Sequence, residues 1–157
     1  MNTWYYISVW LHIVCATFWI GGMLFLPLVL LPAIKNHPER IKFLMATGLK
    51  FRFYGYIFLT GSLITGILNI YFRGINFSWE FFTKRHYGRL VSLKIILFVS
   101  MLFISMMHDI LIGKKAIEQM KTGNTRGFKI IARWTGRILL LISLLMAYIG
   151  VLISRGG

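Results

Sequence analysis

Acidic side chains are nearly absent from this sequence. The 157 residues include only four of them, against 18 lysines and arginines and a net charge of +14. None of the four, which are Glu39, Glu80, Asp109 and Glu118, lies deep inside an apolar run. Paired carboxylates for acid–base hydrolysis are therefore excluded. The sequence also has no nucleophile motif or phosphate-binding loop that would indicate another hydrolytic mechanism.

Cysteine is represented by a single residue, Cys15. One cysteine excludes an internal disulfide and any Cys-x-x-Cys metal or redox motif. A cleavable signal peptide is not expected either, because no basic segment precedes the first apolar run and that run is longer than a signal core. We expect this first segment to remain as a helix.

Apolar sequence, by contrast, is abundant, since 57% of the residues are hydrophobic. Four apolar segments, at about 4–32, 51–72, 90–112 and 134–154, are each near the ~20 residues that cross the hydrocarbon core. The sequence therefore predicts an all-α integral membrane protein. We expect one domain, residues 1–157, folded as an antiparallel bundle of four transmembrane helices. The first segment is longer than a span requires, so it should tilt or bend near Pro27.

Basic residues gather in two of the loops between the spans. These two loops carry Lys35, Arg40, Lys42, Lys50 and Arg52, then Lys114, Lys115, Lys121, Arg126, Lys129, Arg133 and Arg137, whereas the other side has Arg73, Lys84, Arg85, Arg89 and Arg155. This bias places the richer loops in the cytoplasm and both termini outside, in a multi-pass protein of the bacterial inner (cytoplasmic) membrane. We expect the basic residues of these loops to contact the anionic headgroups of the lipid bilayer, and not nucleic acid. We expect the stretch 114–129 to form a short surface helix, with a turn at Gly123 and Asn124.

Helical spacing places small or polar residues on one face of three spans. The first span presents His12, Cys15, Ala16, Trp19, Gly22 and Met23; the second presents Gly55, Leu59, Ser62, Gly66 and Asn69; the third presents Lys94, Phe98, Met101, Ser105 and His108. Small residues let helix backbones approach each other in a membrane, so these faces are expected to form the helix contacts.

His12 is the most informative residue, because ionisable side chains within a span usually face the bundle interior and mark a functional site. At 1.5 Å per residue, His12 lies roughly 10 Å to the outer side of the midplane and His108 roughly 10 Å to the inner side. The two are thus ~20 Å apart in depth and cannot share one metal ion.

The histidines and the cations form two groups by depth. A b-type haem needs an axial imidazole, an apolar slot and cations for its propionates, and each half of the membrane offers these parts. The sequence therefore predicts haem b, with up to two haems, one per leaflet, in electron transfer with quinol or another redox carrier. The outer group is His12, His86 and Lys94; the inner group is His108, His37, Arg52, Arg133 and Arg137.

Simpler interpretations of the same residues stay open. His37 stands in the turn sequence Asn36-His37-Pro38-Glu39 and suits a solvated loop, whereas His86 suits the membrane interface. His108 can pair locally with Asp109, and Lys94 can extend its ammonium toward the headgroups. The oligomeric state is also open, and a homo-oligomer is compatible with the sequence.

Copper is the alternative to haem, since thioether and thiolate ligands select Cu(I). The ligands would be His12, His108, Met101, Met106, Met23 and Cys15. Methionine also fills gaps in apolar bundles, so a packing subunit without a cofactor is a further alternative.

Several short stretches together resemble the CopD (copper-resistance protein D) family. They are Leu11-His12 with Trp19-Ile20-Gly21-Gly22, Phe51-Arg52-Phe53 with Thr65-Gly66-Ile67-Leu68-Asn69, Tyr87-Gly88-Arg89-Leu90 with Leu93-Lys94, and His108-Asp109. The resemblance implies a stand-alone four-helix member and copper transport across the inner membrane. The chain is also distantly similar to the HemJ-type protoporphyrinogen oxidases, which use a first-span histidine and a third-span lysine and bind haem b. His12 and Lys94 match those positions, whereas the tryptophan that this group carries one turn before the lysine is Leu90 here.

Overall fold

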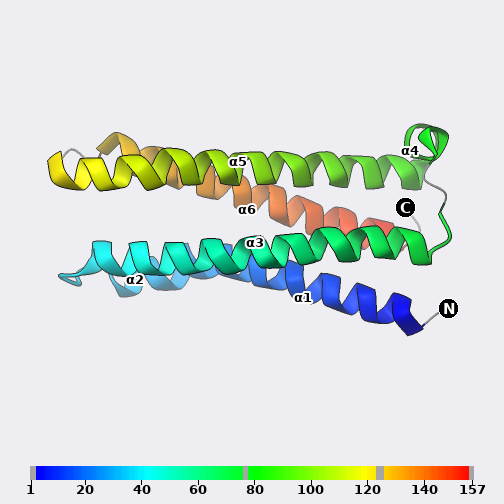
Figure 1. Cartoon of the computed structure of the whole chain (residues 1–157), viewed down its shortest axis with the longest axis horizontal. Coiled ribbons are helices and arrows are strands. Elements are labelled where there is room, and N and C mark those ends of the chain that lie inside the picture. Colours follow the sequence, from blue (N-terminus) through cyan, green and yellow to red (C-terminus); the bar gives the residue numbers. More distant parts are fainter. Residues whose placement is uncertain (1–2, 76–77, 123–125, 156–157) are drawn as a thin grey trace. The chain divides into compact units, whose positions relative to one another are not determined.

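The computed structural model describes residues 3–75, 78–122 and 126–155, and this part of the chain is helical, with no strand. Figure 1 shows the helices α1 (Thr3–Phe25), α2 (Leu31–Ala33), α3 (Arg40–Phe72), α4 (Trp79–Lys84), α5 (His86–Thr122) and α6 (Arg126–Ser154), with a π-helical turn at Leu26–Leu30 between α1 and α2. The all-α prediction is confirmed.

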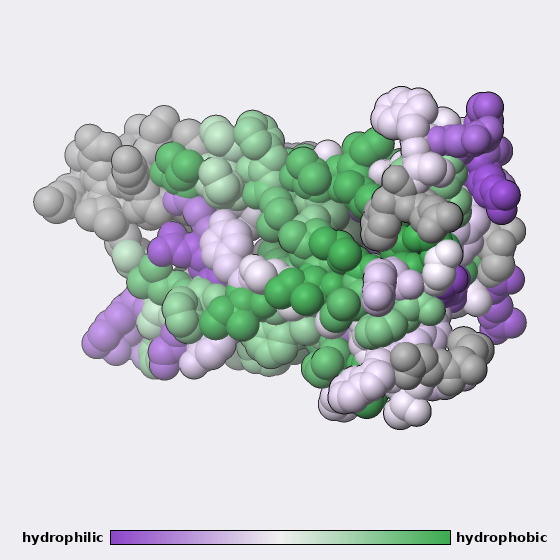
Figure 2. Space-filling view, turned by 45° about the vertical axis from the view of Figure 1, so that its right-hand side comes forward, coloured by the Kyte–Doolittle hydropathy of each residue, from purple (hydrophilic) through white to green (hydrophobic). Residues whose placement is uncertain are grey.

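Four of the helical stretches are long and apolar enough to cross a membrane. They are Thr3–Ala33, Lys42–Phe72, His86–Ile110 and Arg133–Ser154. In Figure 2 hydrophobic side chains cover the middle of the visible helices, and hydrophilic ones gather toward the helix ends. Both observations are typical of a multi-pass membrane protein.

Several helix boundaries differ from the sequence prediction, and α6 begins at Arg126 and not near residue 134. The second long helix begins at Arg40 and not near residue 51, because the basic segment before the apolar run is rich in residues with high helix propensity. The stretch 114–129 does not form a separate surface helix, since α5 continues as one helix to Thr122. The turn predicted at Gly123 and Asn124 lies outside the described residues.

The irregularity predicted at Pro27 takes the form of the π-helical turn Leu26–Leu30. Proline has no N–H to donate, and its ring clashes with the carbonyl one turn earlier. Widening the helix for one turn is a common response to such a defect. The chain then continues as helix through α2 to Ala33.

The chain divides into two compact units, Met1–Asn76 and Phe77–Gly157. In the first unit α1 packs against α3. The predicted faces form this contact, because Gly55 and Leu59 are buried and α1 side chains approach the glycines of α3. A Cβ at Gly55 would lie 2.9 Å from the Trp19 ring, and one at Gly61 would lie 2.9 Å from the Cys15 thiol. Glycine is therefore required for this close approach.

In the second unit α5 packs against α6. Met101 and Ser105 of the predicted α5 face are buried, as are Leu139 and Ser143 of α6. The Ser143 hydroxyl donates to the Leu139 carbonyl over 2.8 Å and lies 3.4 Å from the Met101 sulfur. The Ser143 hydroxyl thus has its partners inside the unit.

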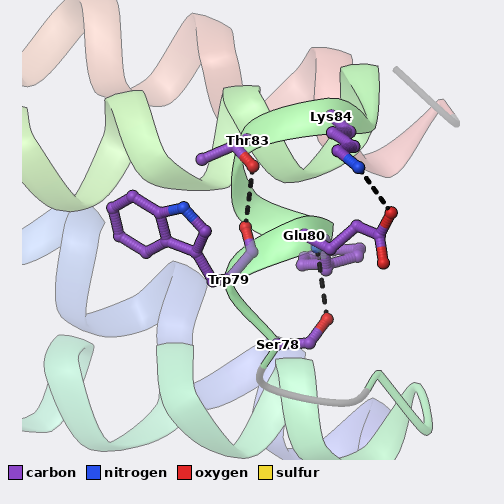
Figure 3. Close-up of polar contacts among 6 residues, drawn as sticks. Ser78, Trp79, Glu80, Thr83 and Lys84 are labelled. Carbon is purple, nitrogen blue, oxygen red and sulfur yellow. Dashed lines mark hydrogen bonds and ion pairs between the residues drawn. The ribbon is translucent and has the colours of Figure 1, made fainter.

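The short helix α4 packs on the start of α5, where a Cβ at Gly88 would overlap the Phe81 carbonyl. Figure 3 shows how α4 is held locally. The Ser78 hydroxyl caps the helix by accepting from the Phe81 N–H over 3.2 Å, and Glu80 pairs with Lys84 at 2.9 Å. N-caps of this kind satisfy backbone donors that have no partner within the helix.

Candidate functional site: the His12 cluster between α1 and α3

His12 is half-buried on the face of α1 that packs against α3. Its Nδ1 lies 2.9 Å from the hydroxyl oxygen of Thr65, a residue that is buried. The ring lies beside Gly66, where a Cβ would stand 3.5 Å from the ring carbon Cε1, an ordinary van der Waals contact. Imidazole therefore sits inside a helix pair that is otherwise mostly apolar.

The hydrogen bonds of Thr65 indicate which imidazole nitrogen carries the proton. The Thr65 hydroxyl donates to the Gly61 carbonyl over 2.7 Å, within its own helix. A hydroxyl has a single proton to donate, so toward His12 the oxygen acts as acceptor and Nδ1 as donor. In this tautomer Nε2 carries the lone pair. A histidine that ligates a metal is usually oriented in this way, by a hydrogen bond from its other ring nitrogen.

Cys15 is the second potential ligand of this region. It stands three residues after His12 on α1, and its sulfur faces Gly61, the residue whose carbonyl accepts from Thr65. Met23 lies further along α1 and is half-buried. Within the described residues, no three His, Cys, Asp or Glu side chains form a group that could hold a metal ion. A metal at His12 would therefore need thioether, backbone or non-protein ligands as well.

Polar contacts continue from His12 toward the start of α1. The Ser8 hydroxyl donates to the Thr65 carbonyl over 3.2 Å, and both residues are buried. At the end of α3, Arg73 Nε donates to the Tyr5 hydroxyl over 2.8 Å, and its guanidinium lies over the Tyr5 ring. Between these contacts the side-chain oxygen of Asn69 is buried, and the described residues offer it no hydrogen bond.

Sequence reasoning missed Tyr5, Ser8, Thr65 and Arg73 as part of this site. A signal was present, because positions 5, 8 and 12 share one face of the first helix and positions 65, 69 and 73 share one face of the second. That these two faces pack against each other is seen only in the tertiary structure.

Lys94 belongs to the second unit and points toward α6. Its ammonium nitrogen lies 3.1 Å from the position of a Cβ at Gly150. The described residues of the unit offer it no ion pair. The side chain is thus directed at the partner helix, as the spacing on α5 predicts.

His108 has a local contact, because its Nδ1 lies 3.7 Å from the Asp109 carboxylate. Both side chains are partly exposed, at 29% and 23%. Of the cations predicted for the inner half, Arg133 and Arg137 are exposed on α6, and the Arg137 guanidinium lies over the Trp134 ring. Arg52, also exposed, lines a shallow groove on α3 with Phe53 and Tyr56.

The two remaining histidines occupy exposed positions. His37 is in the turn between α2 and α3, where its Nδ1 accepts from the Glu39 N–H over 3.1 Å and its ring meets Phe43 edge-on. His86 is the first residue of α5. These positions agree with the simpler interpretations as loop and interface residues.

The methionines of the copper alternative have different surroundings. Met101 is 2% exposed and in contact with Ser143, whereas Met106 is 55% exposed. The two therefore point in different directions from α5.

Comparison with known proteins yields one informative relative. No family model matches the chain, and no solved structure matches it. An uncharacterized protein of Aquifex aeolicus (strain VF5) is 36% identical over 148 residues, which is 93% of this chain and 92% of the relative. The similarity spans all four long helices.

Proposed function

This chain belongs to the same family as the Aquifex aeolicus protein, and we propose that it is an inner-membrane protein that binds haem b through His12 and transfers electrons. Its long, apolar helices support the membrane assignment. The basic loops support an orientation with both termini outside.

The observation that carries the proposal is the hydrogen bond between His12 and Thr65. Because Thr65 donates to Gly61, it holds Nδ1 as the donor and leaves the lone pair on Nε2, the nitrogen that an iron ligand uses. Such an arrangement is more than packing requires, since an apolar residue at position 12 would fill the same space without a buried polar pair.

Haem, when bound, supplies a one-electron redox centre whose potential depends on its axial ligands and its surroundings. His12 holds the iron from the first unit, and His108 is the proposed ligand of a second haem. Lys94, Arg52, Arg133 and Arg137 would neutralise the propionates. Quinol is the proposed electron donor, because it is confined to the same membrane.

An absorption spectrum of the purified full-length protein, with metal analysis, tests the proposal. We expect a Soret band that shifts when dithionite is added. His12→Ala should lose at least half of the haem, whereas His37→Ala, which alters an exposed turn residue, should keep all of it. A colourless protein, or a His12→Ala variant with its full haem content, contradicts the assignment.

Copper transport is the second candidate, because Cys15 and His12 stand on the face of α1 that packs against α3, Cys15 beside Gly61 and His12 beside Thr65 and Gly66. A thiolate and an imidazole one turn apart are typical ligands for Cu(I). Stoichiometric copper in a colourless protein, lost in Cys15→Ser, would favour this function over haem binding.

A further inference from the structure

The short helix α4 folds back along the beginning of α5. Arg85, between the two helices, has an extended backbone with a ψ of 138°, so the helical path is interrupted there. The Ser92 hydroxyl of α5 lies 3.2 Å from the Phe82 carbonyl of α4 and 3.0 Å from the Gly88 carbonyl of its own helix. Gly88 also stands so close to the Phe81 carbonyl that a Cβ would overlap it. These contacts hold α4 against the first two turns of α5.

The contact with Ser92 indicates the level of α4 in the membrane. The span that α5 supplies begins at His86, and at 1.5 Å per residue Ser92 stands roughly 9 Å further along the helix axis. The headgroup region on each side of a bilayer is only about 5–8 Å thick. Because α4 is held beside these turns, it lies where headgroups give way to acyl chains, and not in a loop surrounded by water.

The polar backbone groups of α4 have partners that suit this level. The Ser78 hydroxyl accepts from the Phe81 N–H over 3.2 Å, and the Thr83 hydroxyl donates to the Trp79 carbonyl over 2.9 Å. The Phe82 carbonyl, near the end of the helix, has the hydroxyl of α5 within reach. Backbone groups without a partner are costly where water is scarce, so these contacts allow a short helix to stay folded at the membrane surface.

The side chains of α4 divide into an apolar and a charged side. Trp79 is 83% exposed, more than any other large apolar side chain that the structure describes. Figure 3 shows its ring and the Glu80–Lys84 pair directed to different sides of α4. Tryptophan is enriched at membrane–water interfaces because its ring is apolar and its N–H is polar. The exposed ring therefore fits a lipid surface.

The charge around α4 favours an anionic surface. Glu80 is the only acid between residues 78 and 92, and it pairs with Lys84 at 2.9 Å. Arg85 and Arg89 are exposed and have no acid next to them in the sequence. Arginines that flank a span are attracted to the phosphates of anionic lipids. Charge complementarity thus points to phospholipid as the group that covers this side of the unit.

We propose that α4 anchors the second unit in the membrane interface, with the Trp79 ring inserted among the lipid headgroups and with Arg85 and Arg89 at the lipid phosphates. Because α4 is held on α5 at Gly88 and Ser92, the anchor fixes how deeply α5 sits in the bilayer. With the orientation predicted from the basic loops, the anchor lies in the outer leaflet. The inference goes beyond the proposed function, since it requires no cofactor.

Spin labels on single cysteines test the proposal in the full-length Cys15→Ala protein, reconstituted into vesicles of phosphatidylethanolamine and phosphatidylglycerol. We expect the label of Trp79→Cys to collide with oxygen, which concentrates in the bilayer, and to be shielded from a water-soluble nickel complex, at a depth of about 5–10 Å. The label of Glu80→Cys should collide with the nickel complex, as should that of His37→Cys in its exposed turn. Leu141→Cys, exposed within the last span, calibrates full contact with lipid.

Gly88→Ala tests whether the contact with α5 holds the anchor at its level. The new Cβ must displace the Phe81 carbonyl, so the label at position 79 should become more mobile and lose its shielding from the nickel complex. Gly136→Ala is the matched control in the same unit. No described atom lies within 4 Å of a Cβ at that position, so the label should be unchanged.

Three results would overturn the proposal. The label at position 79 could meet the nickel complex as readily as the label at position 37, which would indicate a hydrated loop. It could be shielded from both reagents, which would mean that protein covers the ring, or it could be unaffected by Gly88→Ala.

If the labelled variants do not fold, fluorine NMR of fluorotryptophan in the wild-type protein decides, with the Trp79 signal identified by its loss in Trp79→Phe. That signal should broaden when the lipid carries a nitroxide near its headgroup, and a signal that stays sharp contradicts the anchor.

Discussion

A single hydroxyl, on Thr65, sets the chemistry of His12. It accepts from Nδ1 while donating to Gly61, so one residue determines both the tautomer and the orientation of the imidazole. The sequence identifies His12 as a site residue because an ionisable group in an apolar span is costly unless it has a role. It does not identify Thr65, which is 53 residues away and is one of many hydroxyl residues in the spans.

Thr65→Val tests this role. Valine keeps the β-branched shape but removes the acceptor of the His12 N–H, so the imidazole loses its fixed orientation. We expect haem affinity to fall by roughly 10- to 100-fold, as it does when such supporting partners are removed from metal sites. The measurement is haem titration of the purified apoprotein.

Thr60→Val is the matched control for that substitution. Thr60 is exposed on the same helix, and its hydroxyl donates to the Tyr56 carbonyl of the preceding turn. Its loss should leave haem affinity within about twofold of wild type. Equal effects of the two substitutions would mean that Thr65 acts through helix stability and not through His12.

Glycine spacing governs how closely α1 and α3 approach each other. The predicted small-residue face of the second span is confirmed as the contact face, with the Trp19 ring against Gly55 and the Cys15 thiol against Gly61. This part of the fold is readable from sequence because helical periodicity is local. The start of α3 at Arg40 differs from the prediction because lysine and arginine, which are frequent in membrane loops, also favour helix.

Gly55→Ala should destabilise the protein by about 1–3 kcal/mol, the usual range for overpacking. The new Cβ would lie 2.9 Å from the buried Trp19 ring, which is stacked on Phe51 and has little freedom to shift. Denaturant unfolding in mixed micelles measures the change.

Gly48→Ala, on the same helix, provides the comparison. No described atom lies within 4 Å of a Cβ at that position, so alanine should stabilise the helix by up to about 1 kcal/mol. A similar loss of stability in both variants would show that Gly55 is not needed for the close contact between α1 and α3.

At the scale of the whole molecule, four long apolar helices form two compact units, each an antiparallel helix pair. The predicted assembly into one four-helix bundle and the outward termini stay predictions. Charge is the physical basis of the orientation, because lysine and arginine in short loops are retained on the cytoplasmic side.

Cysteine labelling in intact cells tests the orientation, in a Cys15→Ala background. We expect Arg155→Cys, at the end of the last helix, to react with a membrane-impermeant maleimide. His37→Cys, in the turn after α2, should react only after the cells are permeabilised. The reverse pattern would invert the topology and place the Tyr5–Arg73 pair on the cytoplasmic side.

The number of long helices, their apolar character and the faces that they bury follow from the sequence alone. These properties depend on the thickness of hydrocarbon and on the helical period, both of which act over one or two turns. Only the tertiary structure decided which residues meet across the helices: His12 with Thr65, Ser8 with Thr65, and Tyr5 with Arg73. Those pairings depend on the register of two antiparallel helices. The packing of Trp19 and Cys15 against glycines that are distant in the sequence sets this register. No local sequence pattern specifies the register.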